Sequence, residues 1–151
     1  LGATLYFTPC AGKFTSLSVS PGFGIGGGSQ SVVAYAEYNL TAALALNDVV
    51  NMMWVPAGAI ITNVRLGGDQ LDTGGTPTLT LDVGDASSAT RFVSTSNVAQ
   101  TGTVGSTPVN FYQYTADTRI QVKAHAAPAT GATSGKIKLE VTYLLDPSFA
   151  A

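Results

Sequence analysis

Hydrophobic and polar residues alternate one by one along several stretches of the chain, as in β-strands that bury one face. In one such stretch Leu79, Leu81 and Val83 fall on one side, while threonines and Asp82 fall on the other. Clusters of Gly, Pro and Thr separate the stretches, and helix signals are scarce. The pattern predicts about eight to ten short strands in an all-β fold, a two-sheet antiparallel sandwich whose length suits a jelly roll. The other positions expected to point inward are Val32, Ala34, Ala36, Tyr38, Leu40, Ile120, Val122, Ala124, Ile137, Leu139, Val141 and Tyr143.

Three stretches depart from this alternation. Residues 55–59 read Val-Pro-Ala-Gly-Ala, a tight turn in which Pro56 fixes φ and Gly58 is free to take a positive φ. Residues 41–54 fit a helix and a pair of short strands equally well, because their alanines and leucines favour helix whereas their valines favour strand. Residues 94–108 are polar and are expected to form a long connection.

The beginning of the chain has a composition of its own. Two short strand-like runs are followed by a glycine-rich stretch in which Phe23 and Ile25 are the only large side chains. This composition predicts an irregular glycine-rich arm, residues 1–31, in front of a β-sandwich domain, residues 32–151.

Charged residues are scarce, at 11% of the chain against 45% hydrophobic residues, and the mean hydropathy is +0.25. Lys13, Glu37 and Asp48 are the only charged residues before Arg65. The first 64 residues are therefore expected to contact protein rather than water. The residues expected to contact a partner are Phe23, Ile25, Val33, Tyr35, Trp54, Arg91, Tyr112 and Tyr114.

Composition also argues against several classes of partner. The net charge is −2 and the seven basic residues are scattered, so no stripe is available to neutralise the phosphates of a nucleic acid. The longest suitable uncharged run, residues 49–64, is too short to span a membrane, and the first ten residues lack the features of a signal peptide. Cys10 is the only cysteine; it is expected to be an inert thiol, with an intermolecular disulfide as the alternative.

Motifs for catalysis or cofactor binding are not convincing, and we expect no enzyme activity, cofactor or metal. Gly22, Gly24 and Gly27 satisfy G-x-G-x-x-G, but a strand-like run follows where a dinucleotide site needs a helix. His125, the single histidine, falls on the outward side of an alternating strand beside Lys123, and no G-x-S-x-G nucleophile motif is present.

Four aspartates fall near predicted strand ends. Asp69 and Asp72 share one loop, while Asp82 and Asp85 flank the end of the strand that precedes Arg91. Their main expected role is turn chemistry, with Asp85 in an Asx-type turn and Asp82 facing outward to keep the strand end soluble. Contact with a partner through Asp82 or Arg91, and a calcium site between the loops, are the alternatives.

The order of several phrases resembles the small β-sandwich structural proteins of tailed bacteriophages, particularly capsid decoration or cement proteins. These phrases are the V-P-A-G-A turn, the L-D-V-G-D strand end, an R-F strand and a final G-x-I-x-L-x-V-x-Y strand. The similarity covers roughly residues 35–145.

The resemblance implies a jelly-roll sandwich that forms a homotrimer, in preference to a dimer, and binds the major capsid protein on the outside of the virion. It implies no reaction. The alternative is a fibre or tail module that binds carbohydrate or another structural protein, for which exposed aromatics such as Trp54, Tyr112 and Tyr114 would be needed.

Overall fold

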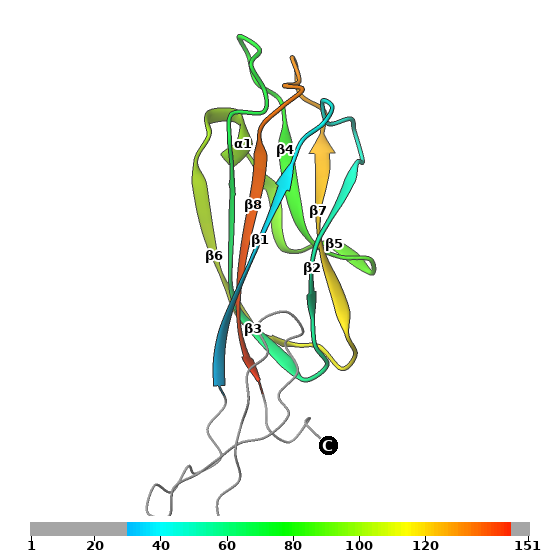
Figure 1. Ribbon diagram of the computed structural model, residues 1–151, viewed down its shortest axis with the longest axis vertical. Coiled ribbons are helices and arrows are strands. Elements are labelled where there is room, and N and C mark those ends of the chain that lie inside the picture. Colours follow the sequence, from blue (N-terminus) through cyan, green and yellow to red (C-terminus); the bar gives the residue numbers. More distant parts are fainter. Residues whose placement is uncertain (1–29, 146–151) are drawn as a thin grey trace, which may run out of the picture.

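Two antiparallel four-stranded sheets pack face to face in the computed structural model, which describes residues 30–145 (Figure 1). One sheet has the strand order β1-β8-β3-β6 and the other has the order β2-β7-β4-β5. The elements are β1 (Gln30–Asn39), β2 (Val49–Val55), β3 (Ala59–Gly68), β4 (Thr80–Asp85), β5 (Ser88–Ser96), α1 (Val98–Thr101), β6 (Val104–Gln113), β7 (Thr118–Ala126) and β8 (Lys136–Leu145).

The strands pair as nested partners, β1 with β8, β2 with β7, β3 with β6 and β4 with β5. A long antiparallel hairpin that is rolled up produces this order, because successive pairs then alternate between the two sheets. The prediction of an all-β, jelly-roll sandwich is therefore confirmed.

The core lies between the two sheets, where the predicted alternation holds except at Tyr38, which was expected to point inward and is exposed. Leu79, Leu81 and Val83 are buried, as are the alternating apolar residues of β7 and β8. Burial of each large aliphatic side chain contributes about 1.5–3 kcal/mol, so this continuous interior is the main source of stability.

Residues 41–54 form neither of the two structures that the sequence left open. The stretch is a loop up to Asp48 and then the single strand β2. Asn47 has a φ of 68°, which a helix does not allow, and the Asp48 carboxylate accepts a hydrogen bond of 2.7 Å from the Ala45 amide. Leu40 anchors the start of the loop in the core, and its amide donates to the Gly135 carbonyl.

The long polar connection expected at residues 94–108 is wrong. This stretch contains the end of β5, the short helix α1 and the first half of β6. Buried Val98 and Ala99 hold the helix against the core, and Gly102, with a φ of 71°, ends it. The aromatic run at residues 109–115 was expected to be a strand, but the first half of β6 was missed because its inward positions, Gly105 and Thr107, are not large apolar residues.

Both ends of the described chain lie at the same end of the sandwich (Figure 1). Gln30 pairs with Leu145 across β1 and β8. The predicted β2–β3 turn is confirmed nearby, with Gly58 at a φ of 83° and its amide donating to the Tyr114 carbonyl. Predictions made for residues 1–29, including the two strand-like runs, Cys10, the glycine motif, Phe23 and Ile25, lie outside the described residues.

Candidate interaction surfaces

Several of the predicted interface residues stand in solvent. Val33 and Tyr35 project from the outer face of β1 and are 61% and 60% exposed, and Trp54 on β2 is 60% exposed. Phe111 and Val104, on β6, are equally exposed but were not singled out from the sequence. Strands β1 and β6 are the two edges of the same sheet, so this sheet carries exposed apolar side chains at both edges.

Each charged residue on the two central strands of that sheet, β3 and β8, has an ionic partner. Arg65 on β3 contacts Glu140 on β8 at 3.2 Å. The other two pairs are Lys136 with Glu37, at 2.7 Å, and Lys138 with Asp69, at 3.3 Å. Ion pairs at exposed positions add little stability, about 0–1 kcal/mol each, but they leave this strip electrically balanced.

The outer face of the second sheet is different, because Arg119 and Lys123 on β7 form no ion pair with a carboxylate among residues 30–145. The Arg119 guanidinium lies 4.5 Å from the centre of the Trp54 ring, a cation–π contact. Gln121 donates a 2.9 Å hydrogen bond to Asn51, and Lys123 follows on the same side of β7. A shallow hollow of about 300 Å³ opens beside Trp54 and Arg119.

A buried carboxylate organises the β5–β6 side of the sandwich. Asp85 accepts hydrogen bonds from the Arg91 side chain, from Ser87 and, at 2.7 Å, from the Tyr114 hydroxyl. Burial raises the pKa of Asp85, but the hydrogen bonds from Arg91, Ser87 and Tyr114 outweigh it and lower the pKa well below its usual value. Burial and the Asp85 charge raise the pKa of Tyr114 far above 10.

This cluster corrects two of the predicted interface residues. Tyr114 is only 5% exposed and is a core residue, so the prediction that it contacts a partner is wrong. Arg91 is held by Asp85 and lies 4.4 Å from the centre of the half-buried Tyr112 ring, so most of its hydrogen-bonding capacity is used inside the chain. A turn and an ion pair, rather than a free surface, account for this part of the sequence.

Of the four aspartates near strand ends, three are buried. Asp72 is fully buried and accepts five backbone hydrogen bonds; Asp82 and Asp85 are 2% exposed. Asp82 accepts from the Thr95 amide and contacts His125 Nδ1 at 2.8 Å, which cover it on the sheet's outer face. The prediction that Asp82 keeps a strand end soluble is therefore wrong, whereas the Asx-type turn at Asp85 is confirmed by the 2.9 Å bond from the Ser87 amide.

No constellation for catalysis or metal binding forms within residues 30–145. No group of three or more His, Cys, Asp or Glu side chains there could hold a metal ion. His125 is half-exposed and bonded to Asp82, but no hydroxyl or thiol in this part of the chain is hydrogen-bonded to it. The aspartates already accept hydrogen bonds from backbone and side-chain groups, so their oxygens are not directed at a common point.

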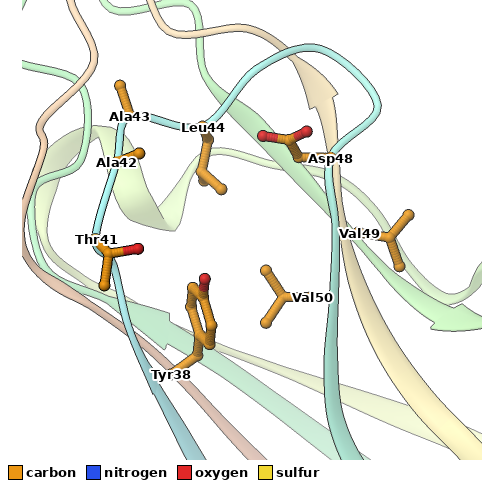
Figure 2. A pocket seen from close by; sticks show the side chains of 8 residues that line it. All are labelled: Tyr38, Thr41, Ala42, Ala43, Leu44, Asp48, Val49 and Val50. Carbon is orange, nitrogen blue, oxygen red and sulfur yellow. The ribbon is translucent and has the colours of Figure 1, made fainter.

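A small hollow lies at the loop end of β1 and β2 (Figure 2). It measures about 150 Å³, and Tyr38, Leu44 and Val50 point into it while Val49 points away (Figure 2). Asp48 is the only charged residue in the lining, and its carboxylate is bonded to the Ala45 amide. The hydroxyls of Tyr38 and Thr41 also line the hollow, which at this volume is smaller than an ordinary ligand pocket.

The three aromatics that a carbohydrate site would need are separated. Trp54 lies on edge strand β2, whereas Tyr112 and Tyr114 belong to an edge-to-face cluster with Phe92 between the sheets. They do not form a shared exposed platform on which a sugar ring could stack. No helix among the described residues is long and apolar enough to cross a membrane.

Solved structures that resemble this sandwich include chains of bacteriophage capsids. No protein-family model matches the chain, and no curated protein matches it. Among solved structures, a chain from the capsid of Ralstonia phage GP4 is 27% identical, with a TM-score of 0.68 over 84% of this chain and 90% of that one. A chain from the acid-stable capsid of Helicobacter pylori bacteriophage KHP30 shares the fold, with a TM-score of 0.56 at 21% identity over 78% of this chain and 94% of that one.

A third structure is more similar in sequence. A chain from the capsid asymmetric unit of cyanophage Pam1 is 36% identical, with a TM-score of 0.73, over 84% of this chain and 91% of that chain. The resemblance to phage structural proteins predicted from the strand phrases is thus confirmed at the level of phage capsids. The chain belongs to the same family as this chain of the cyanophage Pam1 capsid, and it is a phage capsid-related protein.

Proposed function

We propose that the protein is a capsid decoration, or cement, protein that binds the outside of a phage head and stabilises the lattice of the major capsid protein. The 36% identity to a chain of the Pam1 capsid, over nearly its whole length, is the observation that carries the proposal. A small sandwich with exposed apolar edges, and with no catalytic constellation in its described part, fits this role. A protein that binds only the assembled lattice stabilises it by its binding free energy.

The position of the exposed apolar side chains supports self-association as a ring. One set, Val33 and Tyr35, lies on edge strand β1, and the other, Val104 and Phe111, lies on the opposite edge β6. Contact between two different edges is heterologous, and heterologous contacts close into rings such as trimers, whereas a two-fold dimer reuses one patch. We therefore favour a homotrimer, whose several capsid contacts reinforce one another.

The ring can be tested by placing charge on one edge. We expect Tyr35→Lys to shift the protein from an oligomer to a monomer, because a lysine at the buried centre of the contact would lose its hydration without a partner. Leu46→Lys is the matched control: Leu46 is 57% exposed on the β1–β2 loop, away from both edges, and the change should leave the mass unaltered. Light scattering gives the mass, and an unchanged oligomer in Tyr35→Lys would exclude this edge as the contact.

Residues 1–29 supply a second test. They join the sandwich at Gln30, beside Leu145 and at the same end as the β2–β3 turn (Figure 1). We propose that this end faces the capsid and that the glycine-rich segment adds contacts with a partner. Deletion of residues 1–29 is expected to leave the thermal unfolding temperature within about 3 °C of the full chain while weakening attachment at least about tenfold. Aggregation or early melting of the shortened protein would instead assign these residues to the core.

Co-sedimentation with matching phage heads tests the proposed function directly. Heads are isolated before and after expansion, and the protein's oligomeric mass is determined in the same preparation. Saturable binding to expanded heads by a stable oligomer is the expected result. A monomer that binds neither form of the head would reject decoration.

A further inference from the structure

The exposure of Trp54 results from a defect in the strand pairing. Asn51 pairs with Gln121 on β7, but Met53 pairs with Ile120 and Trp54 with Arg119, so one additional residue is accommodated in β2 between Asn51 and Met53. Side chains alternate along a strand, so without the irregularity Asn51 and Trp54, three positions apart, would point to opposite faces. The bulge directs both outward and leaves Trp54 exposed.

This arrangement has the character of a binding surface. Bulges that re-aim a side chain are common next to functional sites, and tryptophan and arginine are the residues most enriched at binding hot spots. Arg119 covers one face of the Trp54 ring at 4.5 Å, and the adjacent hollow is lined also by Met52 and Met53. Methionines adapt their shape to a partner, so the surface combines an aromatic anchor with a deformable apolar floor.

Charge indicates which chemistry the surface would accept. Among residues 30–145, Arg119 and Lys123 are the only lysines or arginines without a carboxylate partner, and both lie on the outward side of β7. His125 continues the row and contacts Asp82, which is almost completely buried. The outer face of β2 and β7 therefore presents two accessible cations next to Trp54, with the nearly buried Asp82 opposite Lys123 in the β4–β7 register.

The acidic residues of this chain are poorly placed to pair with Arg119 and Lys123. Each aspartate and glutamate in the described part already accepts a hydrogen bond from within the same chain. These acids are Glu37, Asp48, Asp69, Asp72, Asp82, Asp85, Asp117 and Glu140. Of these acids within residues 30–145, only Asp48 and Asp117 are exposed without a cation partner, and they lie at opposite ends of β7, so a second copy offers no two neighbouring unpaired acids from this range. Two cations are too few to follow a nucleic-acid backbone.

We infer that the outer face of β2 and β7, centred on Trp54 and Arg119, docks a segment of a different protein that carries acidic side chains next to an apolar one. The inference rests on the proposed function, in which that protein belongs to the phage head. The apolar side chain would enter the hollow beside Trp54 and the acids would pair with Arg119 and Lys123. Partial exclusion of water would strengthen these pairs, and they would still weaken with salt.

The first test uses expanded heads and three single variants. Arg119→Gln and Lys123→Gln are each expected to weaken binding about tenfold at 50 mM NaCl and to flatten its salt dependence. Arg65→Gln is the control, because Arg65 is an exposed cation on the other sheet that is paired with Glu140, and its affinity should stay within about twofold of wild type. Hydroxyl-radical footprinting on the same heads should protect Trp54 and Met53 from oxidation. Binding by wild type without this protection, and with Arg119→Gln equal to Arg65→Gln, overturns the inference and leaves the decoration role intact.

A second test does not require heads. Trp54 is the only tryptophan in the chain, so its fluorescence reports on this surface alone. A synthetic peptide of alternating glutamate and leucine is titrated into the protein at 50 and 500 mM NaCl. A saturable change that is lost in Arg119→Gln and at high salt supports the site even if heads do not bind, and no change in the wild type rejects it.

Discussion

Asp72→Asn is expected to lower the free energy of unfolding by about 3–5 kcal/mol, which corresponds to about 10–20 °C in melting temperature. The Asp72 carboxylate is fully buried and accepts hydrogen bonds from the amides of Gly74, Thr78, Leu79, Ala129 and Thr130. Five backbone donors converge on two oxygens. Asparagine would replace one oxygen by an NH₂ group that faces donors, and several amides would lose their partner.

Chemical unfolding of the variant beside Asp117→Asn measures this effect. Asp117 is the matched control because it is also an aspartate that accepts a backbone bond, at 2.9 Å from the Ala57 amide, but it does so at an exposed site. Its replacement should cost less than about 1 kcal/mol. Equal unfolding free energies for the two variants would mean that the Asp72 hydrogen bonds stabilise the fold no more than the single exposed hydrogen bond of Asp117. If Asp72→Asn does not fold, Asp72→Glu, which keeps the charge but lengthens the side chain, should unfold at an intermediate temperature.

The Asp72 network explains how the loop end of the sandwich is held together. The β3–β4 loop contains Asp72, and the β7–β8 loop supplies Ala129 and Thr130. The Thr73 amide also donates to the Thr130 carbonyl, at 2.9 Å. Two loops far apart in sequence are thus joined through one carboxylate. This carboxylate fixes the position of the two loops beyond the ends of the paired strands.

Alternation predicted the core of this protein because the period of a strand is fixed by backbone geometry. The clearest cases are the predicted inward residues of β7 and β8, all of which are buried: Ile120, Val122, Ala124, Ile137, Leu139, Val141 and Tyr143. The same reasoning failed where the pairing is irregular. The extra residue near Met52 and the positive φ values of Thr95 and Phe111 change which way side chains point. Such shifts depend on the partner strand and leave no local signal in composition.

The aspartates illustrate a second limit of sequence reasoning. A polar residue in an alternating strand normally faces water, and Asp82 fits that pattern. Its burial depends on Thr95 and His125, which are 13 and 43 residues away in the chain. The phage-capsid family, by contrast, was visible in the order of strand phrases. Among the residues predicted to contact a partner, Val33, Tyr35 and Trp54 are exposed and Tyr114 is buried, while Phe111, which is also exposed, was not among them.

Acid is expected to destabilise the folded protein by on the order of 5 kcal/mol between pH 5 and pH 2. Asp72 and Asp85 both have pKa values lowered well below the ordinary 3.8: burial opposes the shift, and hydrogen bonds from backbone amides, or from Arg91, Ser87 and Tyr114, outweigh it. A carboxylate with a lower pKa in the folded state binds fewer protons than in the unfolded state. Its contribution is therefore complete above the unfolded value of about 4 and is lost as pH falls toward the folded value.

Urea unfolding at pH 7, 5, 4, 3 and 2 measures this loss as the change in unfolding free energy. Repulsion among positive charges is not expected to cause a steep fall in unfolding free energy. Once the acids are protonated, the chain's excess positive charge comes from only seven lysines and arginines and one histidine. The slope near pH 3 should correspond to an uptake of nearly two protons on unfolding, one for each carboxylate. Asp85→Asn removes one of these groups, so its slope should be about half that of the wild type, even though the variant is less stable at pH 7. An unfolding free energy that stays constant from pH 5 to pH 2 would contradict the ionised, hydrogen-bonded state of both buried aspartates.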